Sequence, residues 1–175
     1  MVKAVHILTY VDEGASFFAR SAVPVVSARD TVSLQALELG GAQAVVLTDC
    51  QGGDDLQACD VALAVLEARL GLRDGAIRII ASIADSARGL MRATSLEGKS
   101  ARLAGLCWNR ASFAHDMGGS MADDIGELAR MQVAISARSL GVFAYDSAKG
   151  AINEDFRRHS AALGFQGAVI SDGPP

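Results

Sequence analysis

Four aspartates that each follow a short apolar run are the residues of this sequence best placed for chemistry. They are Asp12 in TYVD, Asp49 in VLTD, Asp85 in SIAD and Asp146 in FAYD. A carboxylate just past the end of a strand can face a metal ion or a substrate, and oxygen ligands suit hard cations. Asp is also a favoured helix cap, so each residue has the alternative role of capping the helix that follows.

Two further side chains are candidates for proton transfer or nucleophilic attack. His115 lies beside Asp116 and is a candidate general acid or base, with an exposed position on a helix surface as the alternative. Cys50 follows Asp49 and is a weaker candidate for a nucleophile, because no His lies beside it in the sequence. The three cysteines lack the paired spacing of a zinc site, which indicates reduced, packed thiols and a cytoplasmic location.

The elements that position these residues are short apolar runs rich in β-forming residues. We predict strands over residues 2–8, 23–27, 42–47, 77–83, 102–108, 141–145 and 167–171. The segments between them show helical periodicity. LQACDVALAVLEARLGL follows a capping-box pattern at Asp54 and Gln57, and ADDIGELARMQVAISARSLG ends in glycine, as many helices do.

Strands that are apolar throughout are typical of a sheet that is buried on both faces. Seven such strands alternating with helices predict an α/β protein with a parallel sheet, either doubly wound or barrel-like. In these folds the carboxyl ends of the strands carry the chemistry. We therefore expect the four aspartates to share one rim of the sheet.

The composition limits the classes of partner. A chain of 175 residues that is 50% hydrophobic and 21% charged predicts one compact domain over residues 1–175. A net charge of −4 without a basic face argues against a nucleic-acid partner. The N-terminal apolar run is too short for a signal peptide, and no segment has the length of a membrane span, so we expect a cytoplasmic protein with no membrane partner.

Several segments, in order along the chain, resemble the HpcH/HpaI aldolase and citrate lyase β-subunit family. IRIIASIADSARGLMRATSLEG is similar to a family segment in which an apolar strand leads through Ile-Glu-Thr-Ala-x-Gly into a helix. RLAGLCWNRASFAHDMGG is similar to the next segment, with its Gly-x-x-Asp-Leu-x-x-Asp-Leu-Gly. ARMQVAISARSLGVFAYDS and HSAALGFQGAVIS resemble the two segments that follow. No single motif is diagnostic, but their order and spacing together are fairly specific.

The resemblance implies a TIM-barrel-like (β/α) parallel barrel that binds a keto acid or an acyl-CoA and makes or breaks a carbon–carbon bond. In this family a Glu and an Asp hold Mg²⁺ or a similar divalent ion, whose charge stabilises the enolate oxygen that develops as the bond cleaves.

The match departs from the family pattern where the chemistry lies. By resemblance, the metal ligands fall on Asp85, which replaces a Glu, and on Ser112, which replaces an Asp. Val25 stands where the substrate-binding Arg is expected, and Asp49 follows Thr48 where the family has Pro-Lys. The assignments are Asp49 and His115 as catalytic residues, Val25, Ser27 and Asp12 as substrate-binding residues, and Asp85 and Ser112 as metal ligands. The loss of one carboxylate at Ser112 predicts weak or absent Mg²⁺ binding.

The first matching segment corresponds to the family's second strand, so we expect an incomplete barrel of about seven strands. A barrel that lacks its first unit would have two open edges, which a second subunit or an open arrangement of the strands would accommodate. Two functions remain open. One is a carbon–carbon lyase that acts on a keto acid or acyl-CoA with a divalent metal. The other is a non-catalytic paralogue with an altered metal site that serves in assembly or regulation.

The open edges and the apolar composition predict a homo-oligomer. Light scattering at micromolar concentration should give at least twice the mass of one chain, and a clean monomer would contradict this expectation.

Overall fold

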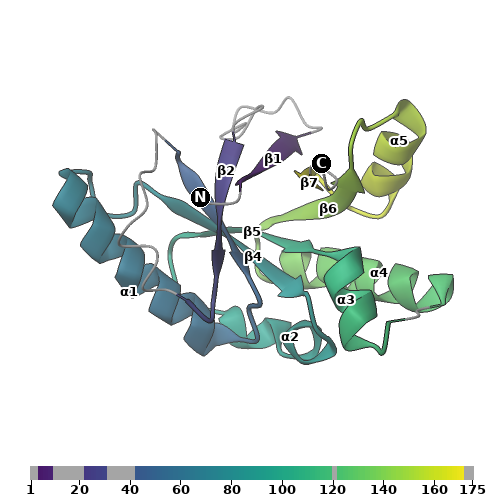
Figure 1. The fold of residues 1–175 in the computed structure, drawn as a ribbon, viewed down its shortest axis with the longest axis horizontal. Helices are drawn as coiled ribbons and strands as arrows, with labels where there is room; N and C mark the ends of the chain where they lie inside the picture. The colour runs from purple at the N-terminus through teal and green to yellow at the C-terminus, as the bar shows by residue number, and fades with distance from the viewer. Residues whose placement is uncertain (1–3, 10–21, 31–41, 120–121, 172–175) are drawn as a thin grey trace.

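Seven strands form a closed barrel in the part of the chain that the structure describes (Figure 1). The structure is a computed structural model that describes residues 4–9, 22–30, 42–119 and 122–171. The strands are β1 (Ala4–Thr9), β2 (Ala22–Ser27), β3 (Ala44–Thr48), β4 (Arg78–Ala84), β5 (Leu103–Trp108), β6 (Phe143–Lys149) and β7 (Gly167–Ser171). Each overlaps one of the seven predicted runs, which confirms a TIM-barrel-like α/β fold with seven strands.

The helices lie outside the barrel. They are α1 (Gly53–Leu70), α2 (Ala87–Met91), the short 3₁₀ helix η2 (Ala93–Leu96), α3 (Arg110–Asp116), α4 (Asp123–Ser139) and α5 (Glu154–Ala162). In Figure 1, α1 lies on one side of the barrel and α4 and α5 lie on the other. No helix in the described ranges has the length and apolar character that crossing a membrane requires.

Strand β1 corrects the expectation of a wholly parallel sheet with open edges. Strands β2 to β7 are parallel to one another, but β1 runs antiparallel to both β2 and β7 and closes the ring between them. This arrangement gives the backbone groups of β2 and β7 hydrogen-bonding partners within the chain, so the edges are paired without a second subunit. The open-edge basis for an oligomer is therefore wrong.

The reversed strand also changes which strands form the functional rim. Thr9, the last residue of β1, pairs with Gly167, the first residue of β7. Strand β1 therefore ends at the opposite end of the barrel from β2, β3 and β4, and its beginning lies toward the end of the barrel where the other strands finish. Asp12 itself lies outside the described residues.

Two apolar layers hold the barrel together. The inner layer fills the barrel with Val5, Val23, Ala44, Val46, Ile80, Cys107 and Tyr145. Gly105 leaves room for the ring of Tyr145, since a Cβ at position 105 would lie 2.5 Å from Tyr145 Cε2. The larger outer layer packs the helices against the strands and includes Leu56, Leu63 and Leu66 of α1. A filled interior is the usual state of a barrel of this size, which is a core and not a pore.

The start of α1 differs from the predicted capping box. The helix begins at Gly53, Gly52 occupies the cap position, and Asp54 makes no capping hydrogen bond. The backbone N–H of Gly53 instead donates to Ser95 Oγ at 3.0 Å. The hydrogen-bond partner for the start of α1 therefore comes from η2, 42 residues further along the chain. Capping rules consider only residues next to the helix and so could not predict it.

Asp146 is buried among the helices, which corrects its expected place on the rim with Asp49 and Asp85. It lies within β6 and is fully buried. Its carboxylate accepts hydrogen bonds from Trp108 Nε1 at 2.8 Å and Ser160 Oγ at 2.6 Å, and it forms a buried ion pair with Arg130. Since Arg130 belongs to α4 and Ser160 to α5, Asp146 joins both helices to the barrel.

Asp146→Asn should lower the free energy of unfolding by about 3–5 kcal/mol, because it leaves the buried guanidinium of Arg130 without its counter-ion. Urea unfolding followed by circular dichroism measures the change. The control is Asp155→Asn on the exposed surface of α5, which should change the free energy by less than about 0.5 kcal/mol. Equal effects of the two substitutions would contradict a structural role for Asp146.

Candidate functional site

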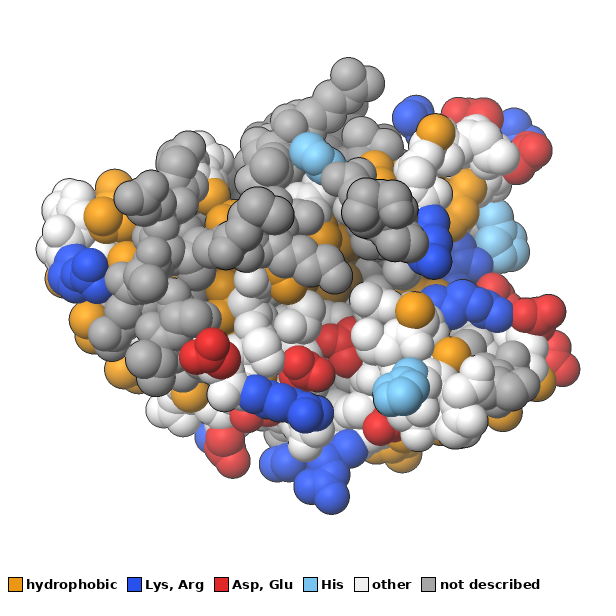
Figure 2. All heavy atoms as spheres, in the orientation of Figure 1, with side chains coloured by type: hydrophobic (Ala, Val, Ile, Leu, Met, Phe, Trp, Pro, Cys, Tyr) orange, Lys and Arg blue, Asp and Glu red, His pale blue; other side chains and the backbone are white. Residues whose placement is uncertain are grey.

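A hollow of about 510 Å³ lies at the carboxyl ends of β2, β3, β4 and β5, and we call it the rim hollow. Its lining residues are Arg29, Asp49, Gln51, Asp85, Ser86, Ala111, Ser112, His115 and Asp116. Figure 2 shows acidic, basic and histidine side chains gathered over this part of the surface, near α2 and α3. The structure thus brings together four of the predicted site residues, Asp49, Asp85, Ser112 and His115.

Asp85 is the buried acid of the rim hollow, with 9% of its surface exposed. Its carboxylate accepts a hydrogen bond from Ser82 Oγ at 2.5 Å and one from the backbone N–H of Asp49 at 2.7 Å. Asp85 does not cap the helix that follows, because Ser86 accepts the hydrogen bond from the N–H of Gly89 at the start of α2. The capping alternative for Asp85 is therefore wrong, and its carboxylate instead links the end of β4 to the end of β3.

Burial raises the pKa of Asp85 from 3.8 to about 6. Removal from water disfavours the ionised form and is the largest cause of this shift. The hydrogen bonds from Ser82 and from the Asp49 backbone favour the carboxylate and oppose the shift in part, while the negative charge of Asp49 adds to it. Asp85 therefore changes protonation close to neutral pH, which is a property of acids that transfer protons.

Asp49 has a backbone conformation that non-glycine residues seldom adopt, with a φ of 57°. The hydrogen bond from its N–H to Asp85 helps to hold this conformation. Its side chain accepts a hydrogen bond from Ser27 Oγ at 2.9 Å, and the guanidinium of Arg29 lies 3.8 Å away. A strained residue at a strand end, beside a buried acid, is typical of functional sites.

Helix α3 supplies Ser112 and His115, which are both exposed. The side chain of Asn109 caps this helix by accepting hydrogen bonds from the N–H groups of Ala111 at 3.0 Å and Ser112 at 3.1 Å. Asp116 accepts a hydrogen bond from the N–H of Ala87 at 2.8 Å, which ties α3 to the start of α2. Helix α3, which carries His115, is thus held by hydrogen bonds at both of its ends.

Two predicted substrate-binding residues have other settings. Val25 packs against the inner layer of the barrel and does not line the rim hollow. Ser27 does not line it either, but reaches it indirectly by donating its hydroxyl hydrogen to Asp49. The sequence analysis missed Arg29 and Gln51. Both follow predicted strands by a few residues, so the rule that selected Asp49 would have found them if it had not been confined to acids.

The cysteines are packed, as expected. Cys50, Cys59 and Cys107 are buried and free. Burial raises the pKa of Cys50 to about 12, so its thiol stays protonated at neutral pH. This rules against the nucleophile alternative for Cys50.

The described residues do not fit the metal site that the resemblance implies. No three His, Cys, Asp or Glu side chains within the described ranges are grouped so that they could hold a metal ion. Ser112 adds no charge, and both oxygens of Asp85 already accept hydrogen bonds. Mg²⁺ is normally held by carboxylates with water or substrate in the remaining positions of an octahedron.

Solved structures share this fold. RipC from Yersinia pestis aligns over 86% of this chain and 70% of its own, with a TM-score of 0.64 and 21% identity. An HpcH/HpaI aldolase/citrate lyase family protein from Burkholderia cenocepacia aligns over 85% and 66%, with a TM-score of 0.62 and 18% identity. Malate synthase from Haloferax volcanii aligns over 75% and 42%, with a TM-score of 0.61 and 20% identity.

These structural similarities show that this chain has the same fold as the aldolase and citrate lyase structures. The resemblance that the sequence segments indicate is therefore confirmed for the fold. No family model and no curated protein matches the chain. The chain spans between 42% and 70% of the three structures named above.

The raised pKa of Asp85 predicts a pH dependence of stability. The folded protein binds the proton of this residue more tightly than the unfolded chain, so the contribution is fully present below about pH 4 and is lost as the pH rises to about 6. Asp85→Asn should remove a fall of about 2–3 kcal/mol in the free energy of unfolding across this range.

Urea unfolding at a series of pH values measures this dependence. Asp116→Asn is the matched control, since Asp116 lines the same hollow but is exposed. An unchanged pH dependence in Asp85→Asn, relative to the wild type, would contradict a raised pKa of Asp85 in the folded protein.

Proposed function

We propose that the rim hollow binds the carboxylate of a small keto acid or an acyl-CoA and catalyses carbon–carbon bond cleavage of the aldolase or citrate lyase type. The observation that carries this proposal is the convergence of one cation, three acids of different burial and one imidazole in a single hollow at the carboxyl end of the barrel. This end carries the active site in enzymes with barrels of this type. The fold shared with aldolase and citrate lyase structures gives further support.

Arg29 is the proposed carboxylate-binding residue. Its side chain is 73% exposed and its guanidinium lies 3.8 Å from Asp49, too long and too solvated for a strong ion pair. A guanidinium can bind a carboxylate through two parallel hydrogen bonds. Arg29, in the loop after β2, can therefore make the ion pair with a substrate carboxylate that the apolar side chain of Val25 cannot make.

Asp49 and His115 are the proposed proton carriers. In cleavage of a 4-hydroxy-2-oxo acid, a base removes the hydroxyl proton, the hydroxyl carbon becomes the carbonyl of an aldehyde, and the electron pair of the broken carbon–carbon bond forms the enolate of pyruvate, which then takes up a proton. Asp49 is more exposed than Asp85 and suits the base, while His115 on the facing helix suits the acid. Ser27 orients Asp49, and Asp85 holds its backbone.

The second candidate function is a non-catalytic paralogue that uses this fold for assembly or regulation. One observation favours it: the described residues lack a group of three metal ligands, and Asp85 serves as a link between strands. Both candidates share the proposal that Mg²⁺ is bound weakly or not at all. They differ in catalysis, since only the lyase would cleave a substrate.

A second copy of this chain is the proposed macromolecular partner. Helix α4 carries large apolar side chains that are exposed, and a second copy of the chain could cover them. These side chains replace the open strand edges as the reason to propose an oligomer, because the strand edges are paired in the closed barrel. The side chains are Ile125, Leu128, Met131 and Ile135.

Substrate binding should depend on Arg29. Arg29→Gln should weaken binding of pyruvate or a 4-hydroxy-2-oxo acid about tenfold or more in calorimetric titration, because a charge-assisted pair is lost. Arg110→Gln, at an exposed arginine on α3, is the control and should bind as the wild type does. Cleavage of the hydroxy acid, followed as release of pyruvate, separates the two candidate functions. Binding without release supports the paralogue, and release that is lost in His115→Ala supports the lyase.

Magnesium binding should be weak in the wild type and stronger in the double variant Ser112→Asp with Asp85→Glu, which restores the family pattern. Calorimetric titration with MgCl₂ compares the two proteins. Tight binding by the wild type that disappears in Asp85→Ala would contradict the proposal and show a rebuilt metal site.

A further inference from the structure

A second hollow lies at the other end of the barrel, and we call it the basal hollow. Its volume is about 1240 Å³. Arg78, Leu103 and Phe143, the first residues of β4, β5 and β6, contribute to its wall. The basal hollow is therefore formed where the strands begin, whereas the rim hollow is formed where they end, and the two share no lining residue.

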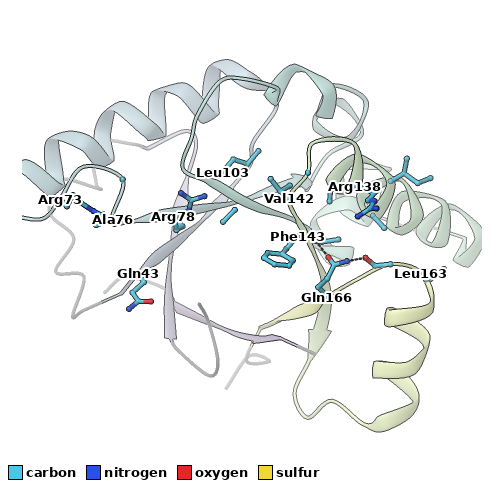
Figure 3. A pocket seen from close by; sticks show the side chains of 18 residues that line it. Gln43, Arg73, Ala76, Arg78, Leu103, Arg138, Val142, Phe143, Leu163 and Gln166 are labelled. Carbon is cyan, nitrogen blue, oxygen red and sulfur yellow. Dashed lines mark hydrogen bonds between the residues drawn. The ribbon is translucent and has the colours of Figure 1, made fainter. Parts of the chain in front are cut away.

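Among the described residues, the charged side chains that line the basal hollow are all basic. They are Arg73, Arg78 and Arg138, with no Asp or Glu from the same ranges, although the chain as a whole carries a net charge of −4. Figure 3 shows Arg73 and Arg78 on one side, Arg138 on the other and Phe143 between them. The three arginines come from the loop before β4, from β4 itself and from the end of α4.

None of these three arginines forms an ion pair with any part of the chain that the structure describes. The nearby Arg102 shows the contrast. It is buried and lies 2.6 Å from Glu67, 3.1 Å from Asp60 and 2.5 Å from Asp74. Within the described ranges, the arginine that has a structural role is therefore neutralised by acids, whereas the three guanidinium groups around the hollow have no acidic partner and can bind an anion.

The rest of the wall is mainly apolar. Phe143 is 40% exposed and Ile135 is 68% exposed, and both line the hollow together with Leu103, Val142 and Leu163. Apolar side chains that lie together in a surface hollow, rimmed by polar residues, are typical of a binding site. Gln166 is held rigidly at the edge, because its Oε1 accepts from the N–H of Ala144 at 2.7 Å and its Nε2 donates to the carbonyl of Gly164 at 2.7 Å.

We propose that the basal hollow binds an amphipathic anion, namely a carboxylate or phosphate group on an apolar chain. The apolar chain would cover Phe143 and Leu163, and the anionic group would bind at Arg78, attracted also by the positive charges of Arg73 and Arg138 around the hollow. The volume exceeds what a drug-sized ligand needs, so a chain of several carbons fits. This site is separate from the rim hollow and does not depend on the reaction proposed there.

Calorimetric titration of the full chain tests the proposal, with decanoate and decyl phosphate as probes below their micelle-forming concentrations. Both should bind at one site, and the stronger of the two identifies the preferred anionic group. Decanol, which lacks the charge, and inorganic phosphate, which lacks the chain, should each bind at least about tenfold more weakly.

Variants locate the site. Arg78→Gln and Arg138→Gln should each weaken binding of the better probe about tenfold. Because Arg138 is exposed, its variant should fold, and circular dichroism of both proteins checks this. Arg157→Gln on the surface of α5 is the matched control and should bind normally, as should His115→Ala in the rim hollow.

Three results would overturn the proposal. Neither probe binds; decanol or inorganic phosphate binds as well as the amphipathic anions; or Arg157→Gln weakens binding as much as Arg78→Gln and Arg138→Gln do. Concentration-dependent mass in light scattering that Arg138→Gln abolishes, without probe binding, would show that another copy of the chain occupies the basal hollow.

Discussion

Burying a carboxylate costs free energy that hydrogen bonds must offset, and the rim of this barrel is arranged around such a carboxylate. Asp85 accepts from Ser82 on its own strand and from the backbone of Asp49 at the end of the neighbouring strand. The second bond holds Asp49 in its left-handed conformation, and Asp49 in turn receives the hydroxyl of Ser27 from β2. The ends of three adjacent strands are therefore connected through one buried acid.

The fold could be predicted from the sequence to a large extent, because its signal is local. Seven apolar runs became seven strands, and their burial on both faces indicated helices outside a parallel sheet. The direction of β1 could not be predicted, since it depends on the pairing of β1 with β7, which is 158 or more residues away along the chain. The start of α1 was misplaced for the same reason, because Ser95 supplies its partner from a distant turn.

The candidate site was predictable only in part. The rule that chemistry lies at the carboxyl ends of parallel strands selected Asp49 and Asp85 correctly as rim residues. The same rule failed for Asp146, because β6 continues to Lys149 and the carboxylate faces Arg130 in the helical layer. Because the rule was confined to acids, it passed over Arg29, which follows β2 and lines the hollow, and the assignment of Val25 by resemblance did not show that this side chain packs inside the barrel.

The central claim is that Asp85 is a structural, proton-exchanging acid and not a tight metal ligand. The most direct measurement is a carbon-13 NMR titration of the Asp85 carboxyl group with and without millimolar MgCl₂. The account predicts a pKa of about 6 that Mg²⁺ changes little. A pKa near the ordinary value for Asp, or a large fall in the pKa when Mg²⁺ is added, would contradict it.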